Sequence, residues 1–474
     1  MIRMSGADSM MLTGETSRAY MHTIKMAILD PSSDPEGWSF ERYFQDFASR
    51  IHLVPMLRWK CAHTPLWINH PMWLDDPNFD LAYHIRQVTC PAPGDQKALC
   101  EFISSIYAGQ LDRNRPLWMC QVVEGLEDGK VASVTLLHHA YVDGIGALYN
   151  LRQLAGSEPG GKPEPAGKPW QPRAWPSWRK RLFWGVRDLP KIGSNLPSVV
   201  WGFFRKKAKE RSLVREGKSR RTDLSMMRRT PLNATLSDSR SFACDSLPLN
   251  DFKRVSREFG VTINDVFLCC AAGVVRRLLQ DVDYDPGKNP LIAGIPFARK
   301  RPAKRQGLGN YATVGYCWLH SDIEDPVERL MASHQAATEM KEHQKATLDV
   351  GVDVHRILQI CPPWALGALR WYINRMRGRV GMFGNLMLSN VPGPREHLYF
   401  NSYRIENWFS TGQVFDGSCI NLTLWSYCDN ANLCVMADEK IVPDGWIPFA
   451  YFVEELAKLG AKVPDSSTAM ETKG

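Results

Sequence analysis

The chain contains 474 residues, of which 44% are hydrophobic and 23% are charged, shares that are typical of a globular protein. It is long enough for two or more cores, because a single core rarely grows beyond ~250–300 residues. The sequence has no run of about 18 uncharged apolar residues and no secretion signal, so we expect a cytoplasmic protein that does not span a membrane. Its twelve cysteines include no C-x-x-C pair, which argues against a zinc or thioredoxin-like site.

The first half is expected to mix strands with helices. Apolar and β-branched residues predict strands over residues 24–29 and 131–137. Apolar residues recur at helical spacing over 38–51, 96–107 and 144–154, which predicts a helix in each range. The second of these strands therefore leads through a short loop into the last of these helices.

Two adjacent histidines, His138 and His139, follow that strand directly. Histidine can take a proton from a hydroxyl near neutral pH, and a loop after a strand can hold its ring in place. Neighbouring side chains on extended backbone face opposite ways, so we expect His139 to be the base and His138 to pack in the wall. Alternatively, both are structural histidines. Asp143 is placed to cap the next helix, where it would orient an imidazole or pair with an arginine, and Gly144 would permit a tight bend.

The segment from about 159 to 229 differs in composition from the rest. Residues 161–230 contain 19 lysines and arginines but only five acidic residues, a net charge of +14, whereas the whole chain carries +8. Such a segment suits an anionic membrane surface, or else it is a solvated crossover linker whose aromatic residues pack on both halves. We expect no nucleic-acid partner, because no recognised binding motif accompanies the charge. Five of the sixteen tryptophans lie here: Trp170, Trp175, Trp178, Trp184 and Trp201.

The second half again mixes the two kinds of element. A basic loop at 299–305 would steer the phosphates of coenzyme A, or would simply be solvated. Patterning predicts strands over 241–247, 292–296, 386–390, 420–428 and 432–437, and helices over 178–189, 251–259, 266–279, 326–345 and 445–459.

Asn264 and Asp265 lie at the start of the helix expected at 266–279. Spacing alone favours a capping role for Asn264, although its amide could instead donate a hydrogen bond to the oxygen that becomes negative when a thioester is attacked. Asp265 is expected to cap the helix or to have another structural role.

Several motifs resemble known acyltransferases. His138-His139-x-x-x-Asp143-Gly144 resembles the HHxxxDG signature of enzymes that share the chloramphenicol acetyltransferase fold. Other blocks resemble the bacterial wax ester synthase/diacylglycerol acyltransferase family: LDRNRPLW at 111–118, TINDV at 262–266, SNVPGP at 389–394 and, more loosely, MSGAD at 4–8. In the first of these, Arg113 and Arg115 are expected to pair with carboxylates, with substrate phosphates as the alternative.

The resemblance implies an α/β fold with mixed α+β sheets, in which two chloramphenicol acetyltransferase-like halves enclose a channel. We expect an N-terminal half at 1–158, a basic crossover linker at 159–229, a C-terminal half at 230–465 and a disordered tail at 466–474.

The resemblance also implies an acyl-CoA-dependent O-acyltransferase that makes wax esters or triacylglycerol. The acyl donor would be fatty acyl-CoA, and the acceptor a long-chain alcohol or diacylglycerol. In this scheme His139 is the general base, Asn264 steadies the oxyanion as family members place a functional asparagine there, and Asp143 supports the site. Attack is direct, without a covalent intermediate, and needs no metal or cofactor beyond acyl-CoA as co-substrate.

Two alternatives stay open. One is an acyltransferase of the same fold with another hydroxyl or amine acceptor, and the other is a non-catalytic acyl- or lipid-binding protein. Beside the cytoplasmic location expected above, peripheral contact with the inner membrane, a lipid droplet or a lipid inclusion is the alternative.

Overall fold

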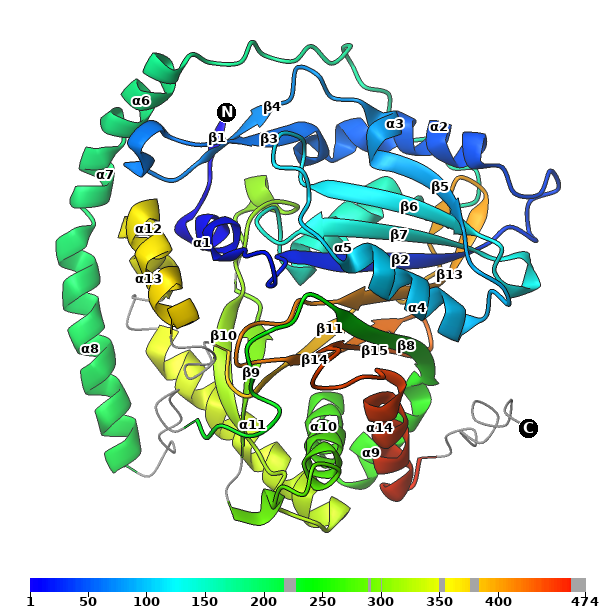
Figure 1. Cartoon of the computed structure of the whole chain (residues 1–474), viewed down its shortest axis with the longest axis vertical. Coiled ribbons are helices and arrows are strands. Elements are labelled where there is room, and N and C mark those ends of the chain that lie inside the picture. Colours follow the sequence, from blue (N-terminus) through cyan, green and yellow to red (C-terminus); the bar gives the residue numbers. More distant parts are fainter. Residues whose placement is uncertain (217–226, 289–290, 300, 349–353, 376–382, 462–474) are drawn as a thin grey trace.

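The computed structural model describes residues 1–216, 227–288, 291–299, 301–348, 354–375 and 383–461. Two six-stranded sheets form the two halves of the molecule, which lie one above the other in Figure 1. Strands and helices mix in both halves without regular alternation, as expected. The predicted tail at 466–474 lies outside the described residues.

Strands β2 and β7 lie at the centre of the N-terminal sheet. Its order is β12-β13-β2-β7-β6-β5, and among these neighbours only β5 and β6 run parallel. The small sheet β1-β4-β3 and the helices of this half lie around it (Figure 1). The bounds are β1 (Ile2–Arg3), α1 (Gly6–Gly14), β2 (His22–Asp30), α2 (Phe40–Arg50), β3 (Trp59–Ala62), β4 (Met72–Asp75), α3 (Leu81–His84), β5 (Ile85–Thr89), α4 (Gln96–Tyr107), β6 (Trp118–Glu124), β7 (Val131–His138), α5 (Gly144–Leu154), β12 (Tyr399–Phe400) and β13 (Tyr403–Thr411).

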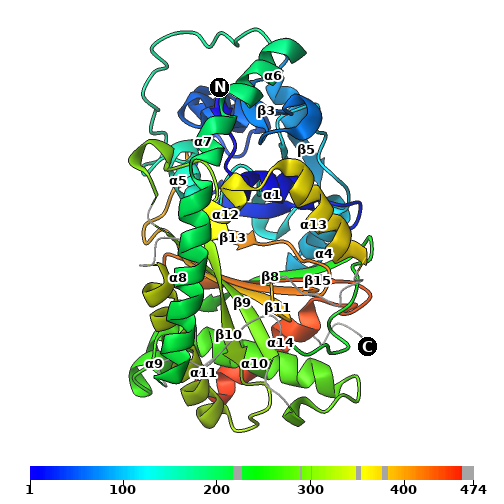
Figure 2. The same ribbon diagram turned by 90° about the vertical axis from the view of Figure 1, so that its left-hand side faces the viewer.

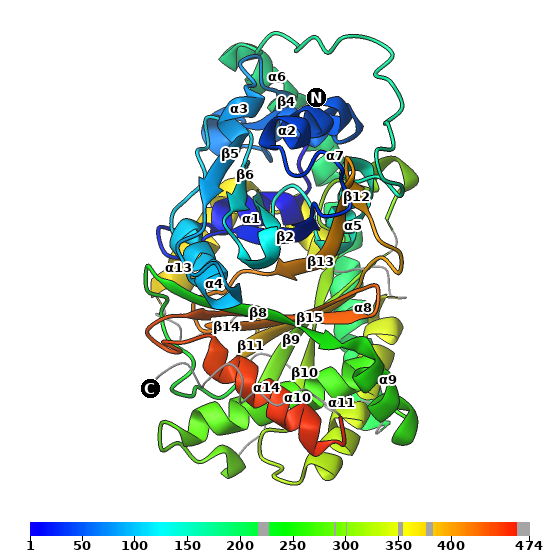
Figure 3. The ribbon, with the colours of Figure 1, turned by 90° about the vertical axis from the view of Figure 1, so that its right-hand side faces the viewer.

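The C-terminal sheet has the order β10-β9-β11-β14-β15-β8, in which β11 runs parallel to both of its neighbours. Helices cover its outer face, away from the N-terminal half (Figure 3). The bounds are β8 (Arg240–Pro248), α9 (Leu249–Glu258), α10 (Ile263–Gln280), β9 (Leu291–Phe297), β10 (Thr313–Leu319), α11 (Pro326–Leu348), β11 (Leu386–Pro392), β14 (Ile420–Tyr427), β15 (Asn430–Asp438) and α14 (Trp446–Lys458).

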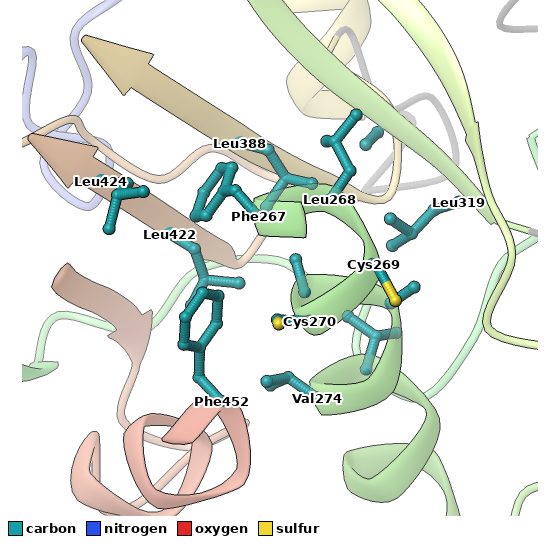
Figure 4. Packing of buried hydrophobic residues seen from close by; sticks show 14 of the residues in the cluster. Phe267, Leu268, Cys269, Cys270, Val274, Leu319, Leu388, Leu422, Leu424 and Phe452 are labelled. Carbon is teal, nitrogen blue, oxygen red and sulfur yellow. The ribbon is translucent and has the colours of Figure 1, made fainter. Parts of the chain in front are cut away.

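Helix α10 is the centre of the C-terminal core. It is apolar on almost every face, which is the pattern of a helix surrounded by protein, and 13 of its 18 residues are buried. Phe267 and Cys270 pack toward Leu422 of the sheet and Phe452 of α14 (Figure 4). A second core joins the halves, because α4 packs against β8. No single described helix is long and apolar enough to span a membrane. Helices α9 and α10 would meet this length and apolarity only if they were taken as one segment, and a bend of 100° separates them.

One boundary expected from the sequence is wrong. Strands β12 and β13 fall within the expected C-terminal half at 230–465, yet β13 pairs with β2 along most of its length and so completes the N-terminal sheet. An edge strand's backbone groups need a partner, and the chain supplies it from the other half.

The expected linker at 159–229 is also more ordered than a linker. It forms α6 (Trp178–Arg187), α7 (Leu189–Gly193) and α8 (Leu196–Arg215), which run along one side of the molecule (Figure 2). There α7 and α8 contact α12 (Val354–Ile360), and α13 (Pro363–Arg375) follows α12 along the chain. Helix α8 also packs on α11, so the segment bridges elements of both halves.

Candidate active site

The loop between β7 and α5 carries both histidines. β7 ends at His138 in the middle of the N-terminal sheet, directly opposite His22 of β2. Asp143 is the N-cap of α5, and its carboxylate accepts a hydrogen bond from the Gly146 amide at 3.1 Å. The strand and helix expected from the sequence therefore fix both ends of a five-residue loop.

His139 is held by its backbone and leaves its ring partly accessible. Its amide donates to the Met21 carbonyl at 2.6 Å, and its carbonyl accepts from the Asn310 side chain at 2.7 Å. Its Nδ1 is buried, so Nε2 is the nitrogen left to meet a substrate. Burial, and then the positive charge of Lys25, lower the pKa of His139 below its usual 6.5, while Asp143 opposes the shift. The ring is therefore an unprotonated base at neutral pH.

His138 is fully buried beside it. Its Nδ1 accepts a hydrogen bond from the Ala140 amide at 3.0 Å, and its Nε2 lies 3.9 Å from Glu15. Burial holds the pKa of His138 well below 6.5, so the ring is neutral in spite of this carboxylate. His138 thus lies in the wall of the site, as expected, while His139 is the accessible member of the pair.

Asp143 connects the two halves. Its Oδ1 forms an ion pair with Arg301, and its Oδ2 accepts hydrogen bonds from the amides of Tyr311 at 2.7 Å and Ala312 at 3.1 Å. Of the two roles expected for Asp143, to orient an imidazole or to pair with an arginine, these contacts match the second. Because Arg301 is almost fully buried in this pair, it does not face solvent as a phosphate-binding residue would. That part of the basic-loop prediction is wrong.

The glycine that the turn requires is Gly146. A Cβ atom on Gly144 would meet Val391 and Trp425 at 3.6 and 3.9 Å, which are ordinary contacts, and its φ is not positive. A Cβ atom on Gly146 would lie 2.7 Å from an Arg301 nitrogen and 2.2 Å from Val142, so a side chain there would displace the arginine. Gly144 does not supply the tight bend expected of it.

Residues 307–312 of the C-terminal half dock onto the histidine loop, and sequence analysis missed their role. The Gly309 amide donates to the Tyr141 carbonyl at 2.6 Å. Asn310 donates through its side chain to both the His139 carbonyl and the Asp8 carboxylate, the latter at 2.9 Å. Asp8 comes from the MSGAD block and is buried, which raises its pKa. Asp8 lies in a block that the sequence singled out, but nothing in the sequence shows that this block meets residues 307–312.

Asn264 is not brought to His139. It lines a pocket of about 730 Å³ on the helix-covered face of the C-terminal sheet, together with Leu424 and Ser426. Successive side chains of β14 point to opposite faces, and Trp425, between those two, lies against Gly144 on the face toward the N-terminal half. The sheet therefore separates the pocket from the histidine loop. A role for Asn264 as oxyanion donor stays a prediction that no described contact supports.

Three other expectations can be compared with the structure. Asp265 forms a capping box with Thr262 at the start of α10, as expected, and also accepts from His334 at 2.7 Å. Arg113 pairs with Glu15 at 2.6 Å, and Arg115 stacks on Tyr83, so both arginines have structural contacts. Of the basic loop, Lys300 lies outside the described residues.

We expect the Asp143–Arg301 pair to be strongly non-additive in stability. Asp143→Asn or Arg301→Met alone should each lower the free energy of unfolding by about 3 kcal/mol, because each leaves a buried charge uncompensated. The double variant should lose clearly less than the sum, as measured by urea denaturation. The exposed pair Arg277–Glu454 is the control, where the same cycle should give at most about 1 kcal/mol. Additive losses at Asp143 and Arg301 would contradict a direct interaction.

Comparison with known proteins agrees with this geometry. The model of the wax ester synthase/diacylglycerol acyltransferase catalytic domain matches residues 4–267, and that of the WS/DGAT C-terminal domain matches residues 308–460. A Mycobacterium tuberculosis protein provisionally named a diacylglycerol O-acyltransferase is 45% identical over 450 residues, 94% of each chain.

Solved structures show the same fold. The wax ester synthase/diacylglycerol acyltransferase from Marinobacter aquaeolei VT8 superposes with a TM-score of 0.67 at 23% identity, over 97% of this chain and 98% of that one. The starter condensation domain of a rhizomide synthetase, solved with C8-CoA, gives a TM-score of 0.57 at 10% identity, over 98% and 95%. The fold is therefore the two-lobed chloramphenicol acetyltransferase type, and the chain belongs to the wax ester synthase/diacylglycerol acyltransferase family of acyl-CoA-dependent acyltransferases.

Proposed function

We propose that the protein transfers a fatty acyl group from acyl-CoA to the hydroxyl of a long-chain alcohol or diacylglycerol, with His139 as general base. The observation that carries this proposal is the state of His139: its backbone is fixed from both halves, its Nε2 is the free nitrogen, and its pKa is lowered. An unprotonated imidazole held in this way is the group that the chemistry needs.

The reaction then proceeds by direct attack. His139 Nε2 takes the hydroxyl proton while the acceptor oxygen forms a bond to the thioester carbon. The carbonyl electron pair moves onto its oxygen, and a tetrahedral oxyanion results. When that pair returns, the C–S bond breaks and imidazolium protonates the departing thiolate. Proton and charge balance without an acyl-enzyme, and the chain's own residues suffice for every step.

The surroundings favour an apolar acceptor. A pocket of about 360 Å³ opens between α1, α13 and the turn at Pro65–Trp67. Its lining is largely apolar and includes Leu12, Trp67 and Trp364, together with Arg113. Arg113 contacts Glu15, which in turn lies beside His138, so the pocket approaches the histidine loop from the N-terminal half. The names of the relatives point the same way, to a wax alcohol or diacylglycerol as acceptor.

Replacement of His139 tests the proposal. We expect His139→Ala to lower kcat for CoA thiol release from palmitoyl-CoA by about 10²–10⁴-fold, because general-base catalysis contributes that much. The assay uses hexadecanol or dioleoylglycerol as acceptor, with the lipid product identified by mass spectrometry. His52→Ala, which changes a histidine bonded only to the Glu164 carbonyl, should leave the rate unchanged.

Each other outcome has a distinct meaning. Equal activity in His139→Ala would remove His139 as base. Turnover only with a short alcohol or an amine would keep the base and change the acceptor class. Palmitoyl-CoA binding without any turnover would favour the non-catalytic acyl-binding alternative.

The second part of the proposal is peripheral contact with an anionic lipid surface. Helices α6, α8 and α13 lie on one side of the molecule (Figure 2). These helices and the turn at 65–67 carry many exposed large apolar residues. We call this side the tryptophan face; its exposed apolar members are Leu66, Trp67, Trp178, Phe183, Trp201, Phe204, Trp364 and Trp371. Trp201, Trp364 and Trp371 are each about two-thirds exposed, at 67%, 64% and 64%.

Positive charge lies within the same face. Lys180 and Arg181 belong to α6, and Arg205, Lys206 and Lys207 belong to α8, directly after Phe204. Tryptophan and phenylalanine between basic residues fit the interface of an anionic membrane, where the rings enter the headgroup region and the cations meet lipid phosphates. The apolar pocket described above opens at this face, since Leu66, Trp67 and Trp364 belong to both. A lipid acceptor would therefore reach the enzyme from the bilayer.

Vesicle sedimentation tests this contact. Neutralising Lys180, Arg181, Arg205, Lys206 and Lys207 to glutamine should lower binding to phosphatidylglycerol vesicles more than tenfold, because each basic residue near the surface contributes about 1 kcal/mol. Binding to pure phosphatidylcholine vesicles should be weak and unaffected.

The control is a variant with the same change in net charge at positions outside the tryptophan face. Five exposed basic residues outside the face are neutralised, and this variant should sediment with anionic vesicles like the wild type. If the two variants behave alike, the tryptophan face is not an electrostatic membrane surface. The control positions are Arg86, Lys97, Arg257, Lys440 and Lys458.

A further inference from the structure

Lys25 of β2 points between the two halves of the molecule. Its Nζ donates a hydrogen bond to Ser410 of β13 at 2.5 Å and lies 5.9 Å from the centre of the Trp425 ring of β14. Within the described part of the chain, no carboxylate forms an ion pair with it. An ammonium group in this position is costly, because burial removes most of its water without supplying a counter-charge.

The register of the sheet places Lys25 at the histidine end of β2. His22 lies opposite His138, the Met21 carbonyl accepts from the His139 amide, and Lys25 follows three residues after His22 on the same strand. From the other half, Trp425 reaches both Lys25 and the start of α5, where it lies against Gly144. Lys25 and His139 are close enough for the charge of one to shift the pKa of the other.

A purely structural role does not account for this lysine. Its hydrogen bond to Ser410 joins two residues that are already paired in the β2–β13 ladder, so the strands do not need it. An aliphatic side chain at position 25 would pack between the sheets without the cost of desolvating a charge. A partly buried cation held between the two sheets near His139, with which no described carboxylate forms an ion pair, is the arrangement expected where negative charge develops during a reaction.

We propose that the Lys25 ammonium group stabilises the oxyanion that forms when the acceptor oxygen attacks the thioester at His139. This inference rests on the proposed function. As the new C–O bond forms, the carbonyl electron pair moves onto the oxygen on the Lys25 side, and the hydroxyl proton goes to His139. As the C–S bond breaks, the pair returns and the thiolate takes the proton from His139. Lys25 keeps its own proton throughout and acts through its charge.

The proposal has a signature in the pH dependence of the rate. The charges of Asp143 and Cys434 act on Lys25. The charges of Lys25 and Asp143 act on His139. Burial lowers the pKa of Lys25 from 10.5 to about 8, so the ammonium form is lost as the pH rises above 8. If that form is needed, kcat falls on this alkaline side. On the acid side, the rate falls as His139 becomes protonated, and burial together with the charge of Lys25 places the pKa of His139 below its usual 6.5.

Three variants test the proposal in the thiol-release assay with palmitoyl-CoA and hexadecanol. Lys25→Met should lower kcat by about 10²-fold, with little change in KM, because a lost oxyanion-stabilising group acts mainly on the transition state. It should also move the acid limb to higher pH, since His139 no longer faces a positive charge. Lys25→Arg should retain part of kcat and lose the alkaline limb near pH 8, because guanidinium stays charged. Lys130→Met, at the far end of β7, is the control and should resemble the wild type.

The outcomes separate this inference from the proposed function. A kcat within about threefold of the wild type in Lys25→Met, with an unchanged acid limb, would overturn the role of Lys25. If Lys25→Met does not fold, as judged by circular dichroism, an identical alkaline limb in the wild type and Lys25→Arg would overturn it equally. Full activity in His139→Ala would instead overturn the proposed base, and with it the chemistry that Lys25 serves.

Discussion

The site depends on one contact between the halves, the docking of residues 307–312 and Arg301 onto the histidine loop. Asp143 caps a helix of the N-terminal half and at the same time accepts from Arg301 and from two backbone amides of the C-terminal half. Asn310 holds the His139 carbonyl from the same segment. Because a buried carboxylate with four donors is expensive to separate from them, the two halves hold one arrangement around His139. The backbone of His139 is thus held from both halves, while its Nδ1 has no hydrogen-bond partner among the described residues.

The charges near His139 have different functions. Asp143 is fully paired, so its influence on the imidazole is weakened, and it acts as a brace rather than as a partner of the ring. Lys25 forms no ion pair with a described carboxylate, and its charge favours the neutral form of the imidazole. A neutral base beside a cation suits a reaction in which a proton arrives on one atom while negative charge grows on another. The cation makes the imidazole a somewhat weaker base and makes the oxyanion more stable.

Most helices and strands could be predicted from the sequence, but the contacts between them could not. The strand and helix on either side of the histidines follow from patterning, and Asp143 was correctly expected as an N-cap. What patterning cannot show is contact between residues far apart in the chain. Asn310 lies 171 positions from His139, and Arg301 lies 158 from Asp143. For the same reason β13 was assigned to the wrong half, and Asn264, close to a helix start, was expected at a site from which a sheet separates it.

Gly146 and Lys25 are two single positions whose roles depend on contacts that the sequence does not show. Gly146 is required only because Arg301 passes over the first turn of α5, and nothing in the local sequence indicates that passage. Lys25 lies in a strand of otherwise apolar character, where one polar residue is easily taken for a solvent-facing position. Its meaning appears only when β13 and β14 enclose it.

The arrangement of charge also separates catalysis from lipid contact. The basic residues of α6 and α8 lie at the surface, where counterions screen them over about 8 Å at physiological ionic strength. Lys25 and the Asp143–Arg301 pair lie between the sheets, where salt screens far less. Added salt should therefore weaken the attachment to anionic lipid while the chemistry on a dispersed acceptor continues.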